Sequence, residues 1–450
     1  NVFIGYQSGE EVTTGNNSIA VGKWALRNVT DGSNNTAIGY GASNNITTGT
    51  NNVSMGFASQ TGTTAASNVS IGYGAGSALT TGASNTVVGT QTADALTTGA
   101  NNVAIGKGAM GASTTAINCT AIGDSAMLLA TTSDYTVAIG HQAAGGATLT
   151  TNGNVFIGAN AGVVATAPLG TVAVGQGCMD SLTDGGYNTA VGAQSLRTIT
   201  DAAYNTAIGY NAMGVATSGA NNVGVGYNVG EALTTGTENV LVGNAGGSSL
   251  TTGAKNVALG KNSGVGTTAS QNVSVGYQAG SSLTTGANCI FIGYQAGLTG
   301  SPGGAITTAS NEIGFGDENI SAANIQVDWT IASDKRDKTD VEPLDLGLDF
   351  INKLEPVTYR WDKRSKYSDD QSVVPDGTNK EEQLEGGFLA QDVETIEQEY
   401  GYNKEDKTNL VIHQSEDKQM YGIKYSKLVP MLVKAVQELS AEVEELKKEK

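Results

Sequence analysis

Short apolar runs recur along the segment 1–330, and each run ends in a glycine. The residue before this glycine is apolar in all nineteen copies, whereas the residue two places before it is Ala, Ser or Gly in fourteen. The five exceptions are Phe3, Val87, Phe156, Leu241 and Phe291. This alternation predicts a short β-strand with large residues on one side and small residues on the other. The small column would let another part of the backbone approach closely.

The glycines that end these runs follow one another every 17 positions, with slips to 16 or 18. An Asn usually precedes each run and a T-T-G segment separates the runs, so each repeat predicts strand, turn, strand, turn, with Asn and Gly accepting positive φ. Such a unit cannot bury its apolar face alone, but stacked units can. We expect a parallel β-solenoid that rises about 4.8 Å per turn, or roughly 80 Å in all. The glycines are Gly5, Gly22, Gly39, Gly56, Gly72, Gly89, Gly106, Gly123, Gly140, Gly158, Gly175, Gly192, Gly209, Gly226, Gly243, Gly260, Gly276 and Gly293, with an irregular copy at Gly316.

The segment 331–450 follows a different pattern. Apolar residues from Leu344 to Leu354 have helical spacing and Pro356 ends the helix, after which Val357, Tyr359 and Trp361 alternate as a strand. Further elements are expected as an exposed loop over 362–385, a strand turning into a helix over 386–394, and short strands at 410–412 and 420–425. These elements predict a small α+β domain.

A terminal helix is expected over 426–450, with Ser426 as its N-cap and Pro430 in its first turn. Its apolar residues have spacings of 3 and 4, which is typical of a coiled-coil seam. Val alternating with Leu favours two strands, but the seam is too short to fix the number of chains. The alternative is a helix packed on its own domain. The seam residues are Val429, Leu432, Val436, Leu439, Val443 and Leu446.

Charge divides the chain at about residue 331. The segment 1–330 holds 6 Lys+Arg and 15 Asp+Glu, whereas the shorter segment 331–450 holds 18 and 27. We therefore predict a repeat shaft over 1–316, a linker over 317–332 and a separate domain over 333–450. Since the chain begins at Asn1 rather than Met, we expect it to be part of a longer protein.

Composition excludes several function classes. The net charge of −18 argues against nucleic acid, which requires a basic surface. No apolar stretch is long enough to insert into a membrane. His141 and His413 stand alone and the cysteines are dispersed, so we expect no metal and no cofactor. The cysteines are expected to be free thiols, with a bridge between chains as the alternative; they are Cys119, Cys178 and Cys289.

The repeats N-N-T-A-I-G-Y-G-A, from Asn34, and N-N-V-A-I-G-K-G-A, from Asn101, resemble the head repeats of YadA-type trimeric autotransporter adhesins. Those heads are trimers of left-handed parallel β-rolls, and similar repeats occur in phage fibres. The resemblance covers about 1–316. It implies that this β-roll is trimeric.

Three motifs of the segment 331–450 resemble the C-terminal intramolecular chaperone of endosialidase-type phage tail spikes and fibres. They are S-D-x-R-x-K from Ser333, G-x-x-A-Q-[DE]-V-E from Gly387, and Y-x-x-L from Tyr425. In that family the domain trimerises, assists folding of the β-rich fibre before it, and then cuts itself off. The resemblance implies Ser333 as nucleophile, Lys338 as its basic partner, and Ala332–Ser333 as the scissile bond, with supporting positions at Asp334, Arg336 and Gln391.

The implied chemistry is that of a Ser-Lys serine endopeptidase with a single turnover. A Ser hydroxyl is a weak nucleophile that needs a base, and a Lys serves if its neighbours or burial favour its neutral form. The spacing alone would not indicate this. The alternative is that Ser333 caps a turn while Arg336 and Lys338 are solvated.

We therefore predict a homotrimeric phage tail fibre, located in the virion and assembled in the host cytoplasm, with a self-cleaving chaperone. Its partner would be a receptor on the host cell surface, with glycans as one candidate. Tyr40, Phe57 and similar residues after the glycines could stack on sugars or brace the rod. Scattered carboxylates argue against a glycoside hydrolase, and Thr beside turn glycines argues against an ice-binding face. The alternative class is a bacterial adhesin passenger without proteolysis.

Overall fold

The computed structural model describes residues 1–298, 301, 304–326, 330–368, 372–415 and 420–449. The chain forms two compact units, Asn1–Ser274 and Val275–Lys450. Nineteen short parallel strands account for the solenoid, which confirms the predicted architecture. They are β1 Val2–Ile4, β2 Ile19–Val21, β3 Thr36–Ile38, β4 Val53–Met55, β5 Val69–Ile71, β6 Thr86–Val88, β7 Val103–Ile105, β8 Thr120–Ile122, β9 Val137–Ile139, β10 Val155–Ile157, β11 Val172–Val174, β12 Thr189–Val191, β13 Thr206–Ile208, β14 Val223–Val225, β15 Val240–Val242, β16 Val257–Leu259, β17 Val273–Val275, β18 Ile290–Ile292 and β19 Ile313–Phe315.

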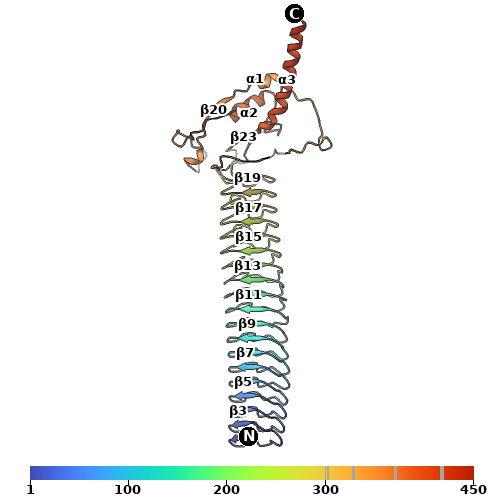
Figure 1. Cartoon of the computed structure of the whole chain (residues 1–450), viewed down its shortest axis with the longest axis vertical. Coiled ribbons are helices and arrows are strands. Elements are labelled where there is room, and N and C mark those ends of the chain that lie inside the picture. Colours follow the sequence, from blue (N-terminus) through green and yellow to red (C-terminus); the bar gives the residue numbers. More distant parts are fainter. Residues whose placement is uncertain (299–300, 302–303, 327–329, 369–371, 416–419, 450) are drawn as a thin grey trace. The chain divides into compact units, whose positions relative to one another are not determined.

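Strands of the first unit stack in sequence order, each one repeat above the last (Figure 1). The register is in step, so that Val103, Ala104 and Ile105 lie opposite Thr120, Ala121 and Ile122. Each repeat contains one strand, so the second strand that we expect per repeat is wrong. At the T-T-G segment, successive turns are instead joined at one carbonyl, as where Thr97 O accepts from Thr80 N at 2.9 Å and from Gly82 N at 3.3 Å.

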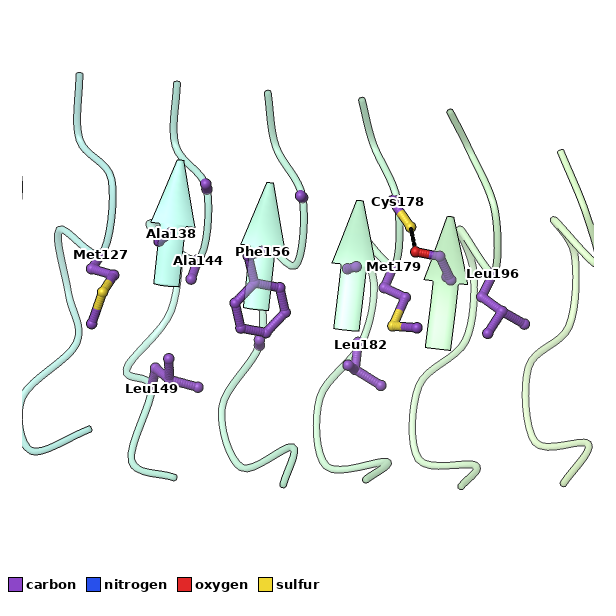
Figure 2. Packing of buried hydrophobic residues seen from close by; sticks show 14 of the residues in the cluster. Met127, Ala138, Ala144, Leu149, Phe156, Cys178, Met179, Leu182 and Leu196 are labelled. Carbon is purple, nitrogen blue, oxygen red and sulfur yellow. Dashed lines mark hydrogen bonds between the residues drawn. The ribbon is translucent and has the colours of Figure 1, made fainter. Parts of the chain in front are cut away.

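The small residue of each strand points into the solenoid and the large residues point out. Ala104 is fully buried, whereas Ile105 is 37% exposed. Small inward residues leave room for Leu and Met side chains from the turn that follows the strand. Figure 2 shows Met127, Phe156 and Met179 along this core, with the turn that holds Ala138, Ala144 and Leu149 between Met127 and Phe156. The interior is therefore a single narrow column of apolar side chains.

Large residues in the small column are compensated within the same turn. Phe156 is fully buried, and a Cβ added to Gly162 would lie 2.2 Å from its ring. The backbone of Gly162 has a φ of +57°, which matches the +55° of Met110, the equivalent residue in a turn whose small column holds Ala. A glycine also faces three other large residues of the small column. Gly9 faces Phe3, Gly247 faces Leu241 and Gly297 faces Phe291.

A ladder of buried Asn residues runs beside the strands, immediately before most of them. Asn222 Nδ2 donates to Gly236 O at 2.8 Å, while Asn222 Oδ1 accepts from Asn239 N at 3.0 Å and from Asn239 Nδ2 at 3.0 Å. Positive φ falls one residue earlier, as at Asn221 with +60°. The predicted positive φ is therefore confirmed for the Asn two residues before the strand, whereas the buried Asn directly before the strand satisfies backbone groups. The glycines after the strands do have positive φ, as predicted.

The three cysteines are buried and form no disulfide with one another. Cys119 occupies a position of the Asn ladder, and its Sγ donates to Ser133 O at 3.1 Å. Burial raises the pKa of the Cys119 thiol to about 11 and that of Cys178 to about 12. Burial of all three thiols in their own chain agrees with the predicted thiols and disfavours the alternative of a bridge between chains.

After β19 the second unit forms the α+β arrangement that the sequence predicts. Antiparallel pairs join β20 to β21 and β22 to β23. The core contains Leu346, Phe350, Val393, Val411 and Met431. The elements are η1 Lys335–Asp337, α1 Leu348–Lys353, β20 Val357–Tyr359, η2 Arg364–Lys366, β21 Glu385–Gly387, α2 Ala390–Glu399, β22 Ile412–Gln414, β23 Tyr421–Ile423 and α3 Tyr425–Lys448. Among the described helices, none has the length and apolar character of a membrane span.

Helix α3 begins one residue before its expected cap. Lys424 is the N-cap, so Ser426 lies inside the helix and Pro430 lies in its second turn. Both expectations are wrong because the helix follows almost directly on β23. Pro430 removes the hydrogen bond that a residue there would donate to the carbonyl four residues earlier.

The two long faces of α3 differ. Leu428, Met431 and Ala435 are buried against the domain core, which agrees with the alternative of a helix packed on its own domain. Farther along, Glu438 accepts a 2.7 Å bond from Leu348 N and so caps α1, and this bond, with the neighbouring Lys434, lowers the Glu438 pKa. The predicted seam lies on another face and is 41–65% exposed, without a partner among the described residues of this chain.

Candidate active site

Residues 330–334, directly before η1, are exposed and have no regular secondary structure. Asp334 is the N-cap of η1, and its carboxylate accepts from Arg336 N at 2.9 Å and from Arg336 Nη2 at 2.6 Å. These bonds lower the pKa of Asp334. The pair therefore closes a tight turn whose geometry depends on both residues.

The turn brings Ser333 and Lys338 together. Lys338 N donates to Lys335 O at 3.3 Å, which reverses the chain, and Lys338 Nζ then lies 2.6 Å from Ser333 Oγ. This separation is within the range that a general base needs to take a proton from its nucleophile. Because Asp334 is the cap, the Ser333 hydroxyl does not cap the turn.

The environment of the pair differs from that of a working Ser-Lys site. Both side chains are exposed to water in the single chain. Ala332 is also exposed and extended, so the bond between Ala332 and Ser333 is accessible. The geometry is thus in place, whereas the desolvation that would favour a neutral lysine is not.

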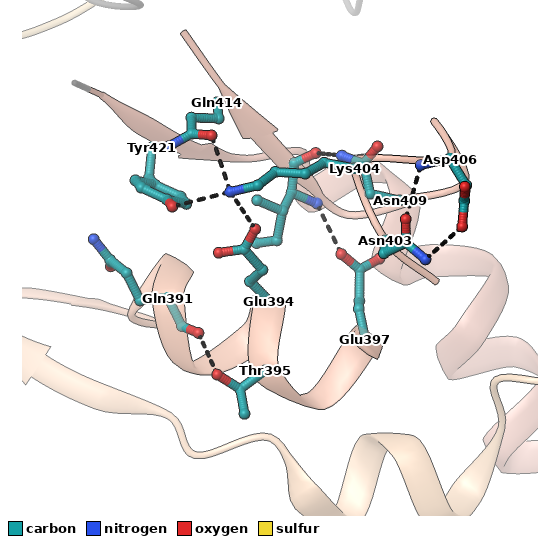
Figure 3. Close-up of polar contacts among 11 residues, drawn as sticks. Gln391, Glu394, Thr395, Glu397, Asn403, Lys404, Asp406, Asn409, Gln414 and Tyr421 are labelled. Carbon is teal, nitrogen blue, oxygen red and sulfur yellow. Dashed lines mark hydrogen bonds and ion pairs between the residues drawn. The ribbon is translucent and has the colours of Figure 1, made fainter. Parts of the chain in front are cut away.

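Gln391, at the start of α2, is not brought to the pair. Its side chain is exposed, and its carbonyl accepts from Thr395 Oγ1 at 3.0 Å (Figure 3). The other residues of the G-x-x-A-Q-[DE]-V-E motif have a structural role. Within the part of the chain that the structure describes, no cluster of three or more His, Cys, Asp and Glu is placed to hold a metal ion.

A polar cluster beside α2 was not predicted from the sequence. Lys404 Nζ lies 3.0 Å from Glu394 Oε1, 3.0 Å from Gln414 Oε1 and 3.3 Å from Tyr421 OH (Figure 3). The bond to Glu394 is the main cause that raises the Lys404 pKa. The only signal for this cluster was Glu394, the last residue of the G-x-x-A-Q-[DE]-V-E motif. The cluster links α2 to both strands of the β22–β23 pair.

Glu397, on the next turn of α2, is almost fully buried. Its Oε1 accepts from Leu410 N at 2.9 Å and Val411 N at 2.8 Å, and its Oε2 from Ile412 N at 3.3 Å. Three backbone donors satisfy a carboxylate that would otherwise be costly to bury. Glu397 therefore fixes the chain entering β22 against the helix.

The segment before the expected scissile bond contacts the domain after it. Lys366 Nζ donates to Asn319 Oδ1 at 2.6 Å, and Lys363 Nζ donates to the carbonyl of Glu318. Lys363 also pairs with Glu381 at 3.1 Å. The loop over 362–385, predicted only to be exposed, thus holds residues 318–319 on the upstream side of Ser333.

Aromatic residues after the strand glycines form short stacks along the solenoid. Ring centroids of Tyr40 and Phe57 lie 5.1 Å apart with an interplanar angle of 5°, and those of Phe57 and Tyr73 lie 5.3 Å apart at 11°. Faces that cover one another are not free for sugars, and only the ring edges point outward. This arrangement favours the bracing role over a stacking platform for glycans.

Comparison with known proteins gives one family. The family model described as the chaperone of endosialidase matches residues 333–402, so the match starts at Ser333. No curated protein and no solved structure matches the chain. That family is one of self-cleaving peptidases. The segment that follows the solenoid is therefore similar to the C-terminal intramolecular chaperone of endosialidases.

Proposed function

We propose that residues 333–450 assemble three copies of the chain, assist folding of the solenoid, and then cut the bond between Ala332 and Ser333. The observation that carries the proposal is the 2.6 Å separation of Lys338 Nζ and Ser333 Oγ, at the residue where the family match begins. The predicted end of the repeat shaft at residue 316 and the predicted end of the linker at residue 332 remain predictions.

The reaction consumes one water. Neutral Lys338 takes the proton of Ser333 Oγ, and the oxygen attacks the carbonyl carbon of Ala332. The C–N bond breaks and the Ser333 nitrogen leaves as an amine, taking the proton from Lys338, so that an ester joins Ala332 to Ser333 Oγ. Water then hydrolyses the ester to an Ala332 carboxylate and a domain that begins with Ser333.

Assembly would supply the desolvation that the single chain lacks. Packing another copy over the exposed turn excludes water and favours the neutral lysine. The exposed seam of α3 is a suitable contact, since Val436 is 65% and Leu446 is 61% exposed. Coiled-coil pairing of these seams would bring three domains together. Cleavage would then follow assembly instead of preceding it.

A repeated solenoid explains the need for such a domain. Its turns are nearly interchangeable, so copies of the chain can align one whole turn out of step. Contacts between distant or separate segments form slowly and leave strand edges exposed. Joining the C-termini of the copies raises the effective concentration of each solenoid near the others and gives them a common starting register. Release of the domain then leaves a shaft that is held kinetically.

The biological setting proposed for this shaft is a phage tail fibre in the virion, with a receptor on the host cell surface. Support comes from the pairing of a long β-solenoid with an endosialidase-type chaperone segment. An adhesin passenger without proteolysis is distinguished by the cleavage test below.

The test compares the whole chain with Ser333→Ala on a denaturing gel. The unchanged chain should yield a fragment of residues 333–450, identified by mass and by an N-terminal Ser333, and the variant should not. Lys338→Met should also remain intact, whereas Lys335→Met, a lysine of the same turn with no bond to Ser333, should be cut. Identical full-length bands in all four would refute the peptidase. The mass of the undissociated species measures the number of copies.

A further inference from the structure

The last turn of the solenoid, between β18 and β19, is longer than the others. Ile290 of β18 pairs with Ile313 of β19, which lies 23 positions further along the chain, whereas the earlier strands follow one another every 16–18 positions. The additional residues lie between Gly297 and Thr307, because the parts of this turn on either side of them stack on the turn before it. Gly304 belongs to this addition and is buried. Its neighbours come from the segment that follows the solenoid.

Gly304 lies against the connection between β22 and β23. A Cβ added to Gly304 would lie 3.1 Å from Ser415 Cβ and 3.2 Å from Met420 Cγ, so the two segments are in close contact. Ser415 and Met420 are joined to each other by two bonds of 2.9 Å, from Ser415 N to Met420 O and from Met420 N to Ser415 Oγ. The surface that they present to the last turn is therefore held in place.

Helix η2 and the residue before it extend this surface towards the end of β19. Arg364 Nη2 donates to Met420 Sδ at 3.4 Å, which joins η2 to the β22–β23 pair. Lys363 and Lys366, on either side of Arg364, hold residues 318–319 by hydrogen bonds. All of these contacts lie within the second unit. We define the docking surface as Lys363, Arg364, Lys366, Ser415 and Met420.

The expected cut would leave every one of these contacts intact. Gly304 and residues 318–319 precede Ala332, whereas the whole docking surface follows Ser333. Between them, the described residues 321–326 and 330–332 are exposed and have no regular secondary structure. Breaking the bond after Ala332 therefore removes a covalent tether, and with it the high effective concentration of the two sides, but no contact between them.

We propose that the docking surface binds the last turn of the solenoid and keeps residues 333–450 on the end of the shaft after the peptide bond has been cut. This inference rests on the cleavage proposed above and goes beyond it. Cleavage and departure are then separate steps. The domain leaves at a rate that the docking surface sets, since differences in affinity lie mostly in the rate of dissociation.

The test supplies the cut from outside. The recognition sequence of a site-specific protease is inserted after Ala332 in the full chain carrying Ser333→Ala, which is held on beads by a tag before Asn1. After complete cutting, the beads are washed and the amount of residues 333–450 that remains is followed over time on a denaturing gel. The fragment should remain after the cut and leave slowly.

Variants on both sides of the contact change the rate of this loss. Lys363→Met combined with Lys366→Met should speed it by about tenfold or more, and Asn319→Ala, which removes one acceptor from the shaft side, by about fivefold. Asn319 is exposed and precedes the domain, so this variant remains informative if the double variant fails to fold. Lys353→Met is the matched control and should leave the rate unchanged, because the ion pair of Lys353 with Glu399 lies within the domain.

The outcomes separate this inference from the proposed peptidase, because the added protease cuts whether or not Ser333 and Lys338 act. A fragment that washes out as soon as the bond is cut would overturn the docking, even if the unchanged chain cleaves itself. A fragment that stays but is lost equally slowly from all variants would show that the docking surface is wrong. A retained fragment from a chain that does not cleave itself would support the docking and refute the peptidase alone.

Discussion

Replacing Phe156 with Ala and Gly162 with Met in the same chain should restore most of the stability that each change alone removes. The two positions share one small space, because a Cβ on Gly162 would lie 2.2 Å from the Phe156 ring. The double variant reproduces an arrangement already present in another turn, where Ala104 and Met110 are both buried. Met110 has a φ of +55° and Gly162 a φ of +57°, so the backbone already accepts the new residue.

The magnitudes follow from burial. Phe156→Ala removes a fully buried ring and should lower the free energy of unfolding by about 3–5 kcal/mol. Gly162→Met alone forces a side chain into the ring and should cost about 1–3 kcal/mol. If the two acted independently, the double variant would lose roughly 4–8 kcal/mol. Because Met fills the cavity that Ala leaves, we expect a loss of about 1–2 kcal/mol instead.

The assay is a double-mutant cycle measured by denaturant unfolding of Ser333→Ala chains, so that every variant keeps the same length. A coupling of about 2 kcal/mol or more supports the compensation. Placing Met at Gly170, which also has positive φ but faces Tyr187 at the surface, is a control that should not rescue Phe156→Ala. Additive losses in the cycle would refute the volume argument.

Two further predictions concern buried polar groups. Asn222→Ala leaves Asn239 N and Gly236 O unpaired inside the solenoid and should lower the free energy of unfolding by about 2–4 kcal/mol, measured with denaturant. The exposed control Asn244→Ala should change it by less than about 0.5 kcal/mol. Equal effects of the two substitutions would contradict the stabilising role of the buried Asn ladder. The buried thiols should resist a thiol reagent at pH 8 until the chain unfolds. Since folding raises the pKa of Cys119 from 9.0 to about 11 and that of Cys178 to about 12, the stability contribution of these two thiols is complete below pH 9 and falls as the pH rises above it. Replacing Cys119 and Cys178 with Ala should flatten the decline in unfolding midpoint between pH 8 and 10.5, and an unchanged slope would contradict this assignment.

Periodicity predicted the solenoid because a column of small residues every 17 positions has few physical explanations. It did not predict which column faces inward, because Ile before the glycine looks like a core residue on hydropathy alone. The inward space is set by the opposite wall, where Leu26 or Met110 already fills it. The same competition explains Phe156, whose large ring is accommodated only because residue 162 is Gly.

The candidate site was predictable in part. Ser333 and Lys338 were identified through a resemblance, and the turn that brings them together follows from Asp334 as a cap. The contacts of residues 318–319 with Lys363 and Lys366 were not predictable, because they join segments about 45 positions apart without any periodic signal. Long-range polar contacts of this kind depend on tertiary placement rather than on local pattern.

Interchangeable turns create a register problem that the irregular turns solve only within one chain. Neighbouring turns contribute nearly equal contacts, so shifting one copy by a turn sacrifices little more than the contacts at its ends. The shorter turn between Gly56 and Gly72, the longer turn between Gly140 and Gly158, and the bulky Phe156 mark particular heights. These irregular turns destabilise a copy that is shifted by one turn only after the shafts have already packed. In the proposed assembly, a domain that joins the copies at one end would set the register before packing begins, and its removal afterwards would leave these irregular turns to hold the register.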